Sequence, residues 1–550
     1  MTRRRVLAIG LDGFDVNLAE GYMAEGQMPA LAALRNRAAR FLLDEGPGPR
    51  RGLEWENVIS GLSPEAEGHW GSVEFDPACY TAWKDGPHLE PWWTKTDLRV
   101  VVFDPPALDL CRAQNTDGIV AWGAHNPRTG RTARPAALLD EFVQRFGDYP
   151  AVEWIYGLPW PSAARCRLMG EGLSRALEVR GRAARWLAAE RLPQWDLFFA
   201  VAGELHGGAE GLWHGVDAGH PLHTHPSAAA AGAAMLDIHR SLDSMVGQLV
   251  NAVRDATVIV FNMGGMGPNN CDVQSMVLLP ELLYRHAFGR QLLTLPAAWT
   301  ATPNRVPILD EPDSWDAAKE FWIPEPRSRT AATAENLRAV ARRIPEPAKS
   351  LLKGVRSAAT DWRSRNALPN RLVENLDYMP CYRYRNHWPR MPAFALPSFL
   401  DGRIRINLRG RERNGIVEMS QYEETCRTLE TMLAECRDPR TGEPTVATIE
   451  RASTANPKNL VGSESDLIVV WRDVAAALKH PRLGLIGPVP FRRTGGHTRH
   501  GIAYLAGPGL EPGERGVHSS SDVAPTIVQL LGAEPPIRLA GKTLLSAPVP

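Results

Sequence analysis

The sequence predicts an α/β fold in which a mainly parallel, doubly wound sheet lies between layers of helices. Three observations predict it: the chain is long and of ordinary globular composition, its apolar runs are short and continuous, and helical patterns separate these runs. With 550 residues, 44% of them hydrophobic and 23% charged, the chain can form one large elaborated domain or two to three smaller ones.

The apolar runs identify the strands. Each is flanked by polar turns, and its apolar residues are consecutive rather than alternating. Continuous apolarity is typical of strands that are buried on both faces, as in a parallel sheet covered by helices. The runs are residues 6–11, 100–103, 197–201, 258–261, 467–470 and 502–505.

Two helical patterns lie between these strands. One begins at Pro29, because proline suits the first turn of a helix, and it continues to Ala38. The other covers residues 229–253 and leads into the strand at residue 258. Its apolar residues recur at spacings of three and four, namely Met235, Ile238, Leu242, Met245 and Leu249.

The composition changes between residues 291 and 390, where proline and arginine are frequent and strand-like runs are rare. Two helices are predicted there, near residues 334–343 and 349–363. Strand-like alternation returns at residues 403–408. We interpret residues 291–390 as an insertion or cap, and residues 1–290 together with 391–550 as the α/β core.

Charge and cysteine content argue against several classes of protein. Sixty-two basic residues balance 62 acidic ones, so no overall charge attracts nucleic acid or an anionic membrane. The seven cysteines are scattered and form no CxxC pair, which argues against a disulfide framework and favours a reducing compartment. The first apolar run stops at Asp12, too early for a signal peptide or a membrane span. We expect a cytoplasmic protein.

Polar side chains follow the predicted strands at residues 6–11 and 197–201. Asp12 lies at the carboxyl end of the first strand, where open α/β sheets place their ligands; it can bind a cation or cap the following segment. Residues 203–225 follow the other strand and contain five histidines, among them His206 and His214, and the carboxylates Glu204, Glu210 and Asp217. Such donors bind zinc, iron or manganese, although a polar loop also uses them for hydrogen bonds.

The order of these segments resembles a known family. It consists of AIGLDGFD, MPALAAL, SGLSPEAEGHWG, WDLFFAVAGELH, VIVFNMGGMG, INLRGRERNGIV, RTGGHTRHGIAYLAGPGL and SDVAPTIVQLLG. Over nearly the whole chain it resembles the alkaline phosphatase superfamily, in particular the type I phosphodiesterase/nucleotide pyrophosphatase branch. The resemblance implies an alkaline-phosphatase-like doubly wound core, two metal ions, usually zinc, and a Thr or Ser nucleophile that attacks phosphorus, or sulfur in sulfatase relatives.

The resemblance implies an incomplete metal site. Asp12, Glu204 and the glycine-flanked His497 match expected ligand positions, with His206 as a further donor and Glu210 or His214 nearby. The strand that relatives end in Ser-Asp-His-Gly ends here in Asn262-Met263-Gly264-Gly265, and Glu210 replaces a histidine, so the site nearest the nucleophile keeps only Asp12. We expect one divalent ion, zinc or else iron or manganese, because such sites need three or four protein donors. No metal and a divergent two-metal site stay open as alternatives.

The expected nucleophile position is occupied by Arg51, ten residues before Gly61. A guanidinium group at Arg51 or Arg50 binds a phosphate, sulfate or carboxylate through paired hydrogen bonds but does not attack it. Alternatively, Arg50 and Arg51 are a pair of surface residues without a role in binding. Glu54 and Glu56 are candidates for an acid/base pair, or solvated residues, and Asn262 is expected to contact the substrate.

Two functions remain after these substitutions. The first is hydrolysis or group transfer on a small anionic phosphate- or sulfate-type ester, with an activated water as nucleophile, Arg51 as anion clamp and Asp12 as ligand or orienting base. The second is a catalytically silent binding or scaffolding subunit. The joint loss of the Thr, Asp and His favours the second, since removing interdependent catalytic groups destroys the original reaction. The many imidazole and carboxylate donors in residues 203–225 favour the first.

Overall fold

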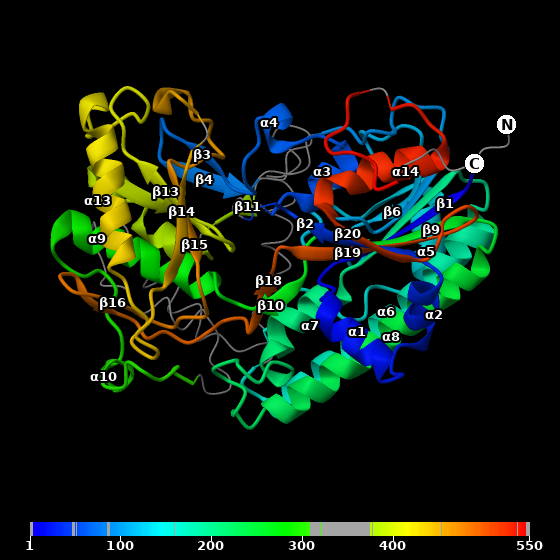
Figure 1. Ribbon diagram of the computed structural model, residues 1–550, viewed down its shortest axis with the longest axis horizontal. Coiled ribbons are helices and arrows are strands. Elements are labelled where there is room, and N and C mark those ends of the chain that lie inside the picture. Colours follow the sequence, from blue (N-terminus) through cyan, green and yellow to red (C-terminus); the bar gives the residue numbers. More distant parts are fainter. Residues whose placement is uncertain are drawn as a thin grey trace, which may run out of the picture.

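A nine-stranded mixed sheet forms the core of the computed structural model (Figure 1). Its strand order is β20-β2-β19-β9-β1-β8-β5-β6-β7, and the strands from β9 to β6 all pair in parallel. The prediction of an α/β fold with a mainly parallel sheet is confirmed. The strands are β1 (Val6–Leu11), β2 (Ala39–Asp44), β5 (Val100–Phe103), β6 (Thr116–Val120), β7 (Thr132–Arg134), β8 (Leu197–Ala202), β9 (Thr257–Asn262), β19 (His500–Ala506) and β20 (Gly513–Ser519).

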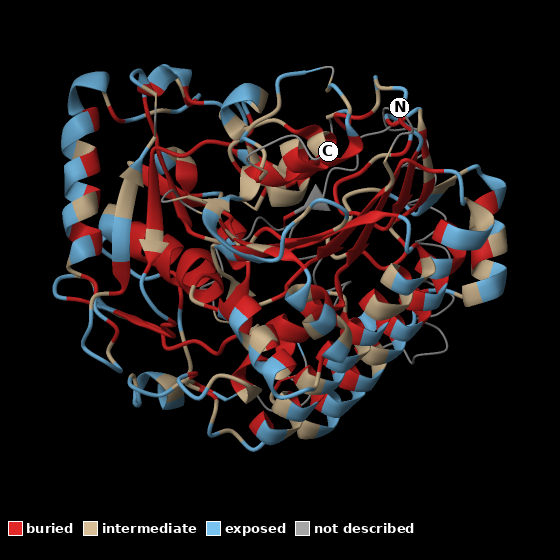
Figure 2. Ribbon diagram, turned by 45° about the vertical axis from the view of Figure 1, so that its right-hand side comes forward, coloured by how far each residue is buried: buried red, intermediate tan, exposed pale blue. Residues whose placement is uncertain are grey.

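Helices cover both faces of this sheet because successive side chains of each strand point to opposite faces. Leu7 and Ile9 of β1 pack into the larger helical layer, and Val6 and Ala8 into the smaller one. Figure 2 shows the sheet as a buried layer and the helices with exposed outer surfaces. The larger layer contains α1 (Val16–Ala24), α2 (Pro29–Asn36), α5 (Ala137–Phe146), α6 (Ala163–Trp186), α7 (Glu204–Leu212) and α8 (Ala228–Ala252), and the smaller one α3 (Glu54–Ser60) and α14 (Val523–Leu531).

A second sheet, antiparallel and four-stranded in the order β12-β13-β15-β14, has its own hydrophobic core. We call this sheet, its helices and two small neighbouring sheets the lobe. The lobe contains β12 (Ala393–Leu396), β13 (Gly402–Ile406), β14 (Val446–Arg451), β15 (Leu467–Trp471), α9 (Leu279–Phe288) and α13 (Tyr422–Ala434). Its small sheets are formed by β3 (Glu74–Asp76), β4 (Thr81–Lys84) and β11 (Glu374–Asn375), and by β16 (Leu478–His480) and β17 (Gly484–Ile486).

One strand predicted for the parallel sheet belongs to the lobe instead. The apolar run at residues 467–470 forms β15 of the antiparallel sheet and does not join the parallel one. A continuous apolar run predicts that both faces of a strand are buried, but it does not predict whether the strand pairs in parallel or antiparallel. The predicted helices at residues 29–38 and 229–253 are present as α2 and α8.

The structure describes residues 4–46, 50, 52–84, 89–158, 160–308, 321, 374–376, 378–452, 454–535 and 537–545. The helices predicted near residues 334–343 and 349–363 lie outside the described residues, and the boundaries of the insertion stay a prediction. Two short helices, α4 (Pro64–Glu67) and α10 (Ala297–Thr300), complete the described α-helices. All seven cysteines are free thiols. Within the described ranges, no helix has both the length and the apolarity needed to span a bilayer.

Candidate functional site

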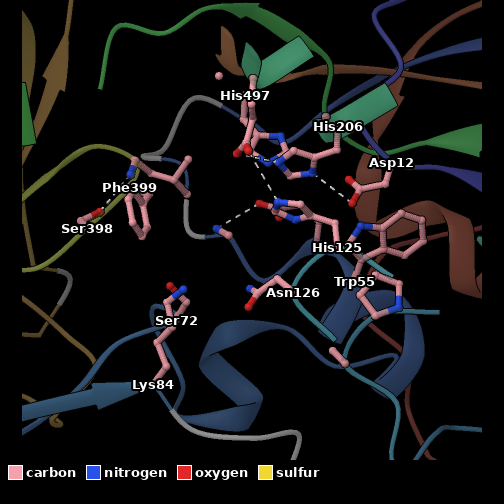
Figure 3. A pocket seen from close by; sticks show the side chains of 18 of the residues that line it. Asp12, Trp55, Ser72, Lys84, His125, Asn126, His206, Ser398, Phe399 and His497 are labelled. Atoms are coloured by element: carbon pink, nitrogen blue, oxygen red, sulfur yellow. Dashed lines mark hydrogen bonds and ion pairs between the residues drawn. The ribbon is translucent and has the colours of Figure 1, made fainter. Parts of the chain in front are cut away.

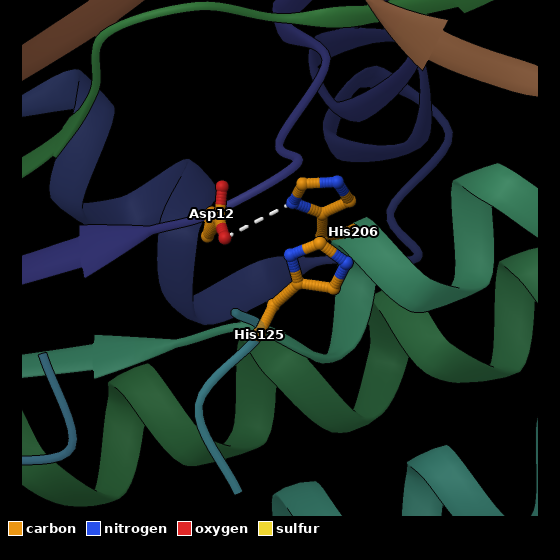
Figure 4. A group of neighbouring side chains, drawn as sticks. All are labelled: Asp12, His125 and His206. Carbon is orange, nitrogen blue, oxygen red and sulfur yellow. Dashed lines mark hydrogen bonds and ion pairs between the residues drawn. The ribbon is translucent and has the colours of Figure 1, made fainter. Parts of the chain in front are cut away.

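Asp12 and His206 are brought together by the parallel pairing of β1 with β8. Leu11 lies opposite Ala202, so the residues that follow the two strands meet at one edge of the sheet. The amide of Asp12 donates to the carbonyl of Ala202 at 2.9 Å. His206, in the first turn of α7, places its Nδ1 3.0 Å from Oδ2 of Asp12 (Figure 4). Two predicted site residues therefore contact each other.

His125 joins this pair from the loop after β6. Its ring stacks on that of His206, with ring centroids 3.6 Å apart and planes inclined by 21°. Asp12, His125 and His206 each offer one donor atom, and these atoms lie within 4.8 Å of one another (Figure 4). His125 is not among the predicted site residues, because β6 has few apolar residues and its sequence does not predict a strand. A histidine shortly after a strand of the parallel sheet is the signal that identifies it.

His497 reaches the same place from a short antiparallel pair. β10 (Met266–Pro268) follows the tip of β9 and pairs with β18 (Gly495–His497), so that Met266 lies opposite His497. The ring of His497 is perpendicular to that of His206, with centroids 4.5 Å apart. The structure thus brings His497 next to His206, and its role as a metal ligand stays a prediction.

His206 lies between two carboxylates. Its Nε2 is 3.3 Å from Oε1 of Glu210, one helical turn further along α7, while Nδ1 faces Asp12. A neutral imidazole carries one N–H and donates to only one of these carboxylates. Nη1 of Arg493 also contacts Oε1 of Glu210, so this oxygen has a donor even when the imidazole N–H faces Asp12.

Two further buried donor atoms fit a cation. Nε2 of His125 and Oε2 of Glu210 have no hydrogen-bond partner among the described residues, and they lie 3.8 Å apart. Buried polar atoms without partners are rare in folded proteins, and nitrogen and carboxylate oxygen atoms are the ligands that zinc accepts. The donor set therefore suits a divalent metal ion.

The electrostatics of the cluster favour the metal-binding protonation states. Burial and the neighbouring His206 hold the pKa values of His125 and His497 well below the usual histidine range, so both rings are neutral and carry a free lone pair. Burial opposes ionisation of Asp12, but the nearby imidazoles, His206 first, outweigh it and lower the pKa of Asp12. Asp12 is therefore a carboxylate.

Glu204 and His214, both expected as metal ligands, lie away from the cluster and do not line the cavity at the site. Oε1 of Glu204 accepts from Nε of Arg180 at 2.8 Å and from the hydroxyl of Tyr149 at 3.3 Å. His214 uses Nε2 with the hydroxyl of Ser227 at 3.0 Å, and its Nδ1 lies 3.4 Å from that of Thr494. Oε2 of Glu204 has no hydrogen-bond partner among the described residues, but neither Glu204 nor His214 faces the cavity.

The cluster opens into a cavity of about 490 Å³ between the α/β core and the lobe (Figure 3). Met263 and Gly264, at the tip of β9, also line this cavity. Asn262 also lines it, with its amide donating to the carbonyl of Phe14. From the lobe side the lining includes Ser72, Lys84, Tyr378, Ser398, Phe399 and Arg403.

Of the two arginines predicted to bind the substrate, the structure describes only Arg50. Arg51 lies outside the described residues. Arg50 is described, but its guanidinium group does not line the cavity. It pairs with Asp401 at 2.8 Å, donates to Asn270 at 3.3 Å and contacts the backbone carbonyl of His497. Arg50 therefore ties the lobe to β18, and these contacts replace the predicted contact with the substrate.

Glu45 and Glu54 add two carboxyl groups to the cavity wall. Burial, and then repulsion from Glu54, raise the pKa of Glu45 well above the usual range, and burial raises the pKa of Glu54. A Cβ atom on Gly264 would lie 2.5 Å from Oε1 of Glu45. The glycine at the tip of β9 thus leaves the room that the Glu45 carboxyl group occupies.

Comparisons with known proteins give similarities of fold. No family model and no curated protein matches this chain. Among solved structures it is similar to phosphonoacetate hydrolase from Sinorhizobium meliloti 1021 with phosphonoformate, at 13% identity over 96% of both chains and a TM-score of 0.45. It is also similar to murine ectonucleotide pyrophosphatase/phosphodiesterase 5, at 11% identity over 98% of both chains and a TM-score of 0.44. A mutant of the alkaline phosphatase PafA is 12% identical over 99% of this chain and 98% of its own, with a TM-score of 0.48.

Proposed function

We propose that the protein is a divergent enzyme of the alkaline phosphatase superfamily that hydrolyses, or transfers groups from, a phosphate- or sulfate-type ester with one divalent metal ion. The observation that carries the proposal is the convergence of Asp12, His125 and His206 on a cavity of about 490 Å³. A cavity of this size suits a small-molecule substrate.

Asp12, His125 and His206 would hold the metal ion, with Glu210 and His497 as neighbouring donors. Zinc fits this mixture of imidazole and carboxylate groups best, and iron or manganese also bind such donors. A bound divalent ion supplies Lewis acidity that polarises an ester oxygen and makes water more acidic. Asp12, facing Nδ1 of His206 at 3.0 Å, fixes the orientation of that imidazole.

Water is the nucleophile in this proposal, because the described residues on the core side of the cavity include no aliphatic hydroxyl group. Among the described residues that line the cavity, the only aliphatic hydroxyl groups belong to Ser72 and Ser398, both on the lobe side. Glu54 lines the cavity and interacts electrostatically with Asp12, and we assign it the role of proton acceptor for the attacking water. The cationic lining residues Lys84 and Arg403 favour an anionic substrate.

A silent binding subunit is the second candidate, and the stacking of His125 on His206 favours it. Rings 3.6 Å apart and inclined by only 21° direct their nitrogen lone pairs side by side, whereas shared metal ligands direct them to one point. In such a subunit the cavity binds an anionic ligand without changing it. The two candidates differ in their metal content and turnover.

Metal analysis of the purified protein separates the two candidates. We expect about one equivalent of divalent metal in the wild type and a loss of most of it in His206→Gln and His125→Gln. His214→Gln is the matched control, since His214 is another buried histidine near α7 but lies outside the cluster. Turnover of nitrophenyl phosphate, a nitrophenyl phosphodiester or a nitrophenyl sulfate should follow the metal content. Metal-free wild-type protein without turnover of any ester would establish the silent subunit instead.

A further inference from the structure

Arg492 and Arg493 are adjacent in the sequence and both line the cavity, but their guanidinium groups have different surroundings. Nε and Nη2 of Arg493 donate to the two oxygens of Asp272 at 2.6 and 2.7 Å, and Nη1 contacts Glu210. Cζ of Arg493 lies 4.7 Å from the centre of the Phe399 ring. Arg493 is therefore fully engaged by the protein.

Arg492 has no comparable partner. Within the part of the chain that the structure describes, its side chain makes no ion pair and no hydrogen bond, and its Nε is buried without an acceptor. The carboxylate on which its charge acts is Asp272, which Arg493 already pairs. A buried N–H of a charged group without an acceptor is costly, so this guanidinium points to a ligand that enters the cavity.

The backbone around Arg492 is anchored on both sides. The carbonyl of Phe491 accepts from the indole Nε1 of Trp160 at 2.8 Å, and the amide of Thr494 donates to the carbonyl of Glu210 at 2.7 Å. The same segment continues directly into β18 and His497. Arg492 and His497 are thus held by one supported segment, as expected of a binding residue.

We infer that Arg492 is the residue that binds the phosphate- or sulfate-type oxyanion of the substrate. A guanidinium group offers a planar fork of N–H donors that matches two oxygens of such a group. This role was predicted for Arg50 and Arg51, but Arg50 is held by Asp401 and the His497 carbonyl. The inference rests on the proposed function, in which the cavity receives an anionic ester.

Binding of inorganic phosphate tests the inference without any turnover. Isothermal titration of the full-length wild type with orthophosphate should show binding, and Arg492→Gln should weaken it at least about tenfold. Arg492→Lys should retain part of the affinity, because an ammonium group keeps the charge but loses the fork. Arg482→Gln is the control: its side chain is 72% exposed, pairs with Glu435 at 3.5 Å, and should bind phosphate like the wild type.

The outcomes of this experiment are distinct. Equal phosphate affinity in the wild type and Arg492→Gln, or no phosphate binding by the wild type, would overturn the inference. Tighter binding of acetate than of orthophosphate or sulfate would overturn the assignment to a tetrahedral oxyanion. Metal content and thermal unfolding of each variant, expected to be unchanged, show that the loss arises at Arg492. An inactive protein that binds phosphate through Arg492 would uphold this inference and refute the proposed reaction.

Discussion

Gly13 lies directly against the backbone of His206, and a Cβ atom at Gly13 would collide with the amide nitrogen and Cα of His206. Gly13 also has a φ angle of +79°, a region that favours glycine. The glycine that follows Asp12 therefore lets α7 approach the end of β1, and this approach places His206 beside Asp12.

Replacing Gly13 by alanine should displace His206 as well as strain the backbone. We expect Gly13→Ala to lower the free energy of unfolding by about 3 kcal/mol and to reduce metal content, measured by urea denaturation and metal analysis. Gly26→Ala measures the cost of placing alanine at a positive φ angle alone, because Gly26 has a φ of +75° but no atoms within 4 Å of an added Cβ. If both variants lose the same stability and keep their metal, the contact with His206 does not constrain the site.

Replacing Arg50 by glutamine should weaken the connection between the lobe and β18. Asp401, 1% exposed, would lose its ion-pair partner, and the carbonyl of His497 would lose a donor. We expect a loss of about 3 kcal/mol in unfolding free energy and faster release of metal to a chelator. Arg515→Gln, at an exposed position, should behave like the wild type. Arg50→Gln with unchanged stability but weaker phosphate binding would restore the substrate role first predicted for Arg50.

Replacing Glu204 by glutamine distinguishes a structural carboxylate from a metal ligand. Its Oε1 pairs with Arg180, which also pairs with Asp104 at 3.0 Å, and all three side chains are buried. We expect Glu204→Gln to lower stability, because the variant weakens a buried ion pair, and to keep the wild-type metal content. Metal analysis and urea denaturation of the same variant show whether Glu204 is a structural carboxylate or a metal ligand. A folded Glu204→Gln protein without metal would show that the family-based ligand assignment is right.

The helical geometry of α7 explains why the candidate ligands were only partly predicted. The polar composition of residues 203–225 predicts a loop, in which any imidazole or carboxylate can turn toward a ligand. Because α7 begins at Glu204, that residue and His206 point about 160° apart around the helix axis, and only one of them faces the cluster. Glu210, four residues after His206, shares its face. Recognising the helix would have selected His206 and Glu210 together.

Strand prediction failed where burial and sequence pattern diverged. The runs at residues 6–11 and 100–103 coincide with β1 and β5, because both are consecutive apolar residues inside the parallel sheet. The strand β6 reads TDGIV, with two polar residues and a glycine, and its pattern gives no strong signal. His125 follows β6, so the missed strand also hid a candidate ligand.

Replacing Glu54 by glutamine tests the proton acceptor. The amide analogue keeps the shape of the side chain and its bond from the amide of Gly52, but it cannot accept a proton. On the ester that the wild type turns over, we expect kcat to fall by about a hundredfold with metal content unchanged. Glu65→Gln, at an exposed position of α4, should retain kcat. An unchanged kcat in Glu54→Gln would assign the proton transfer to another group.

His239 makes the fold sensitive to acid. It is 1% exposed on α8, and burial lowers its pKa from 6.5 to about 4. Between these values the unfolded chain binds a proton that the native state does not, so stability falls as the pH drops from 6.5 toward 4 and levels off below. The slope contributed by one such group is up to about 1.4 kcal/mol per pH unit.

His239→Phe should therefore remove part of the acid sensitivity. The phenyl ring can keep the edge contact with Tyr22, and the carbonyl of Met235 keeps its helical hydrogen bond, so the variant mainly removes the titrating group. Urea denaturation between pH 4.5 and 7.5 should show a shallower loss of unfolding free energy than in the wild type. His500→Phe, whose side chain is 63% exposed, should follow the wild-type curve. Parallel curves for His239→Phe and the wild type would show that His239 does not govern the acid response, and His220, whose pKa burial lowers to about 4, would be the next histidine to replace.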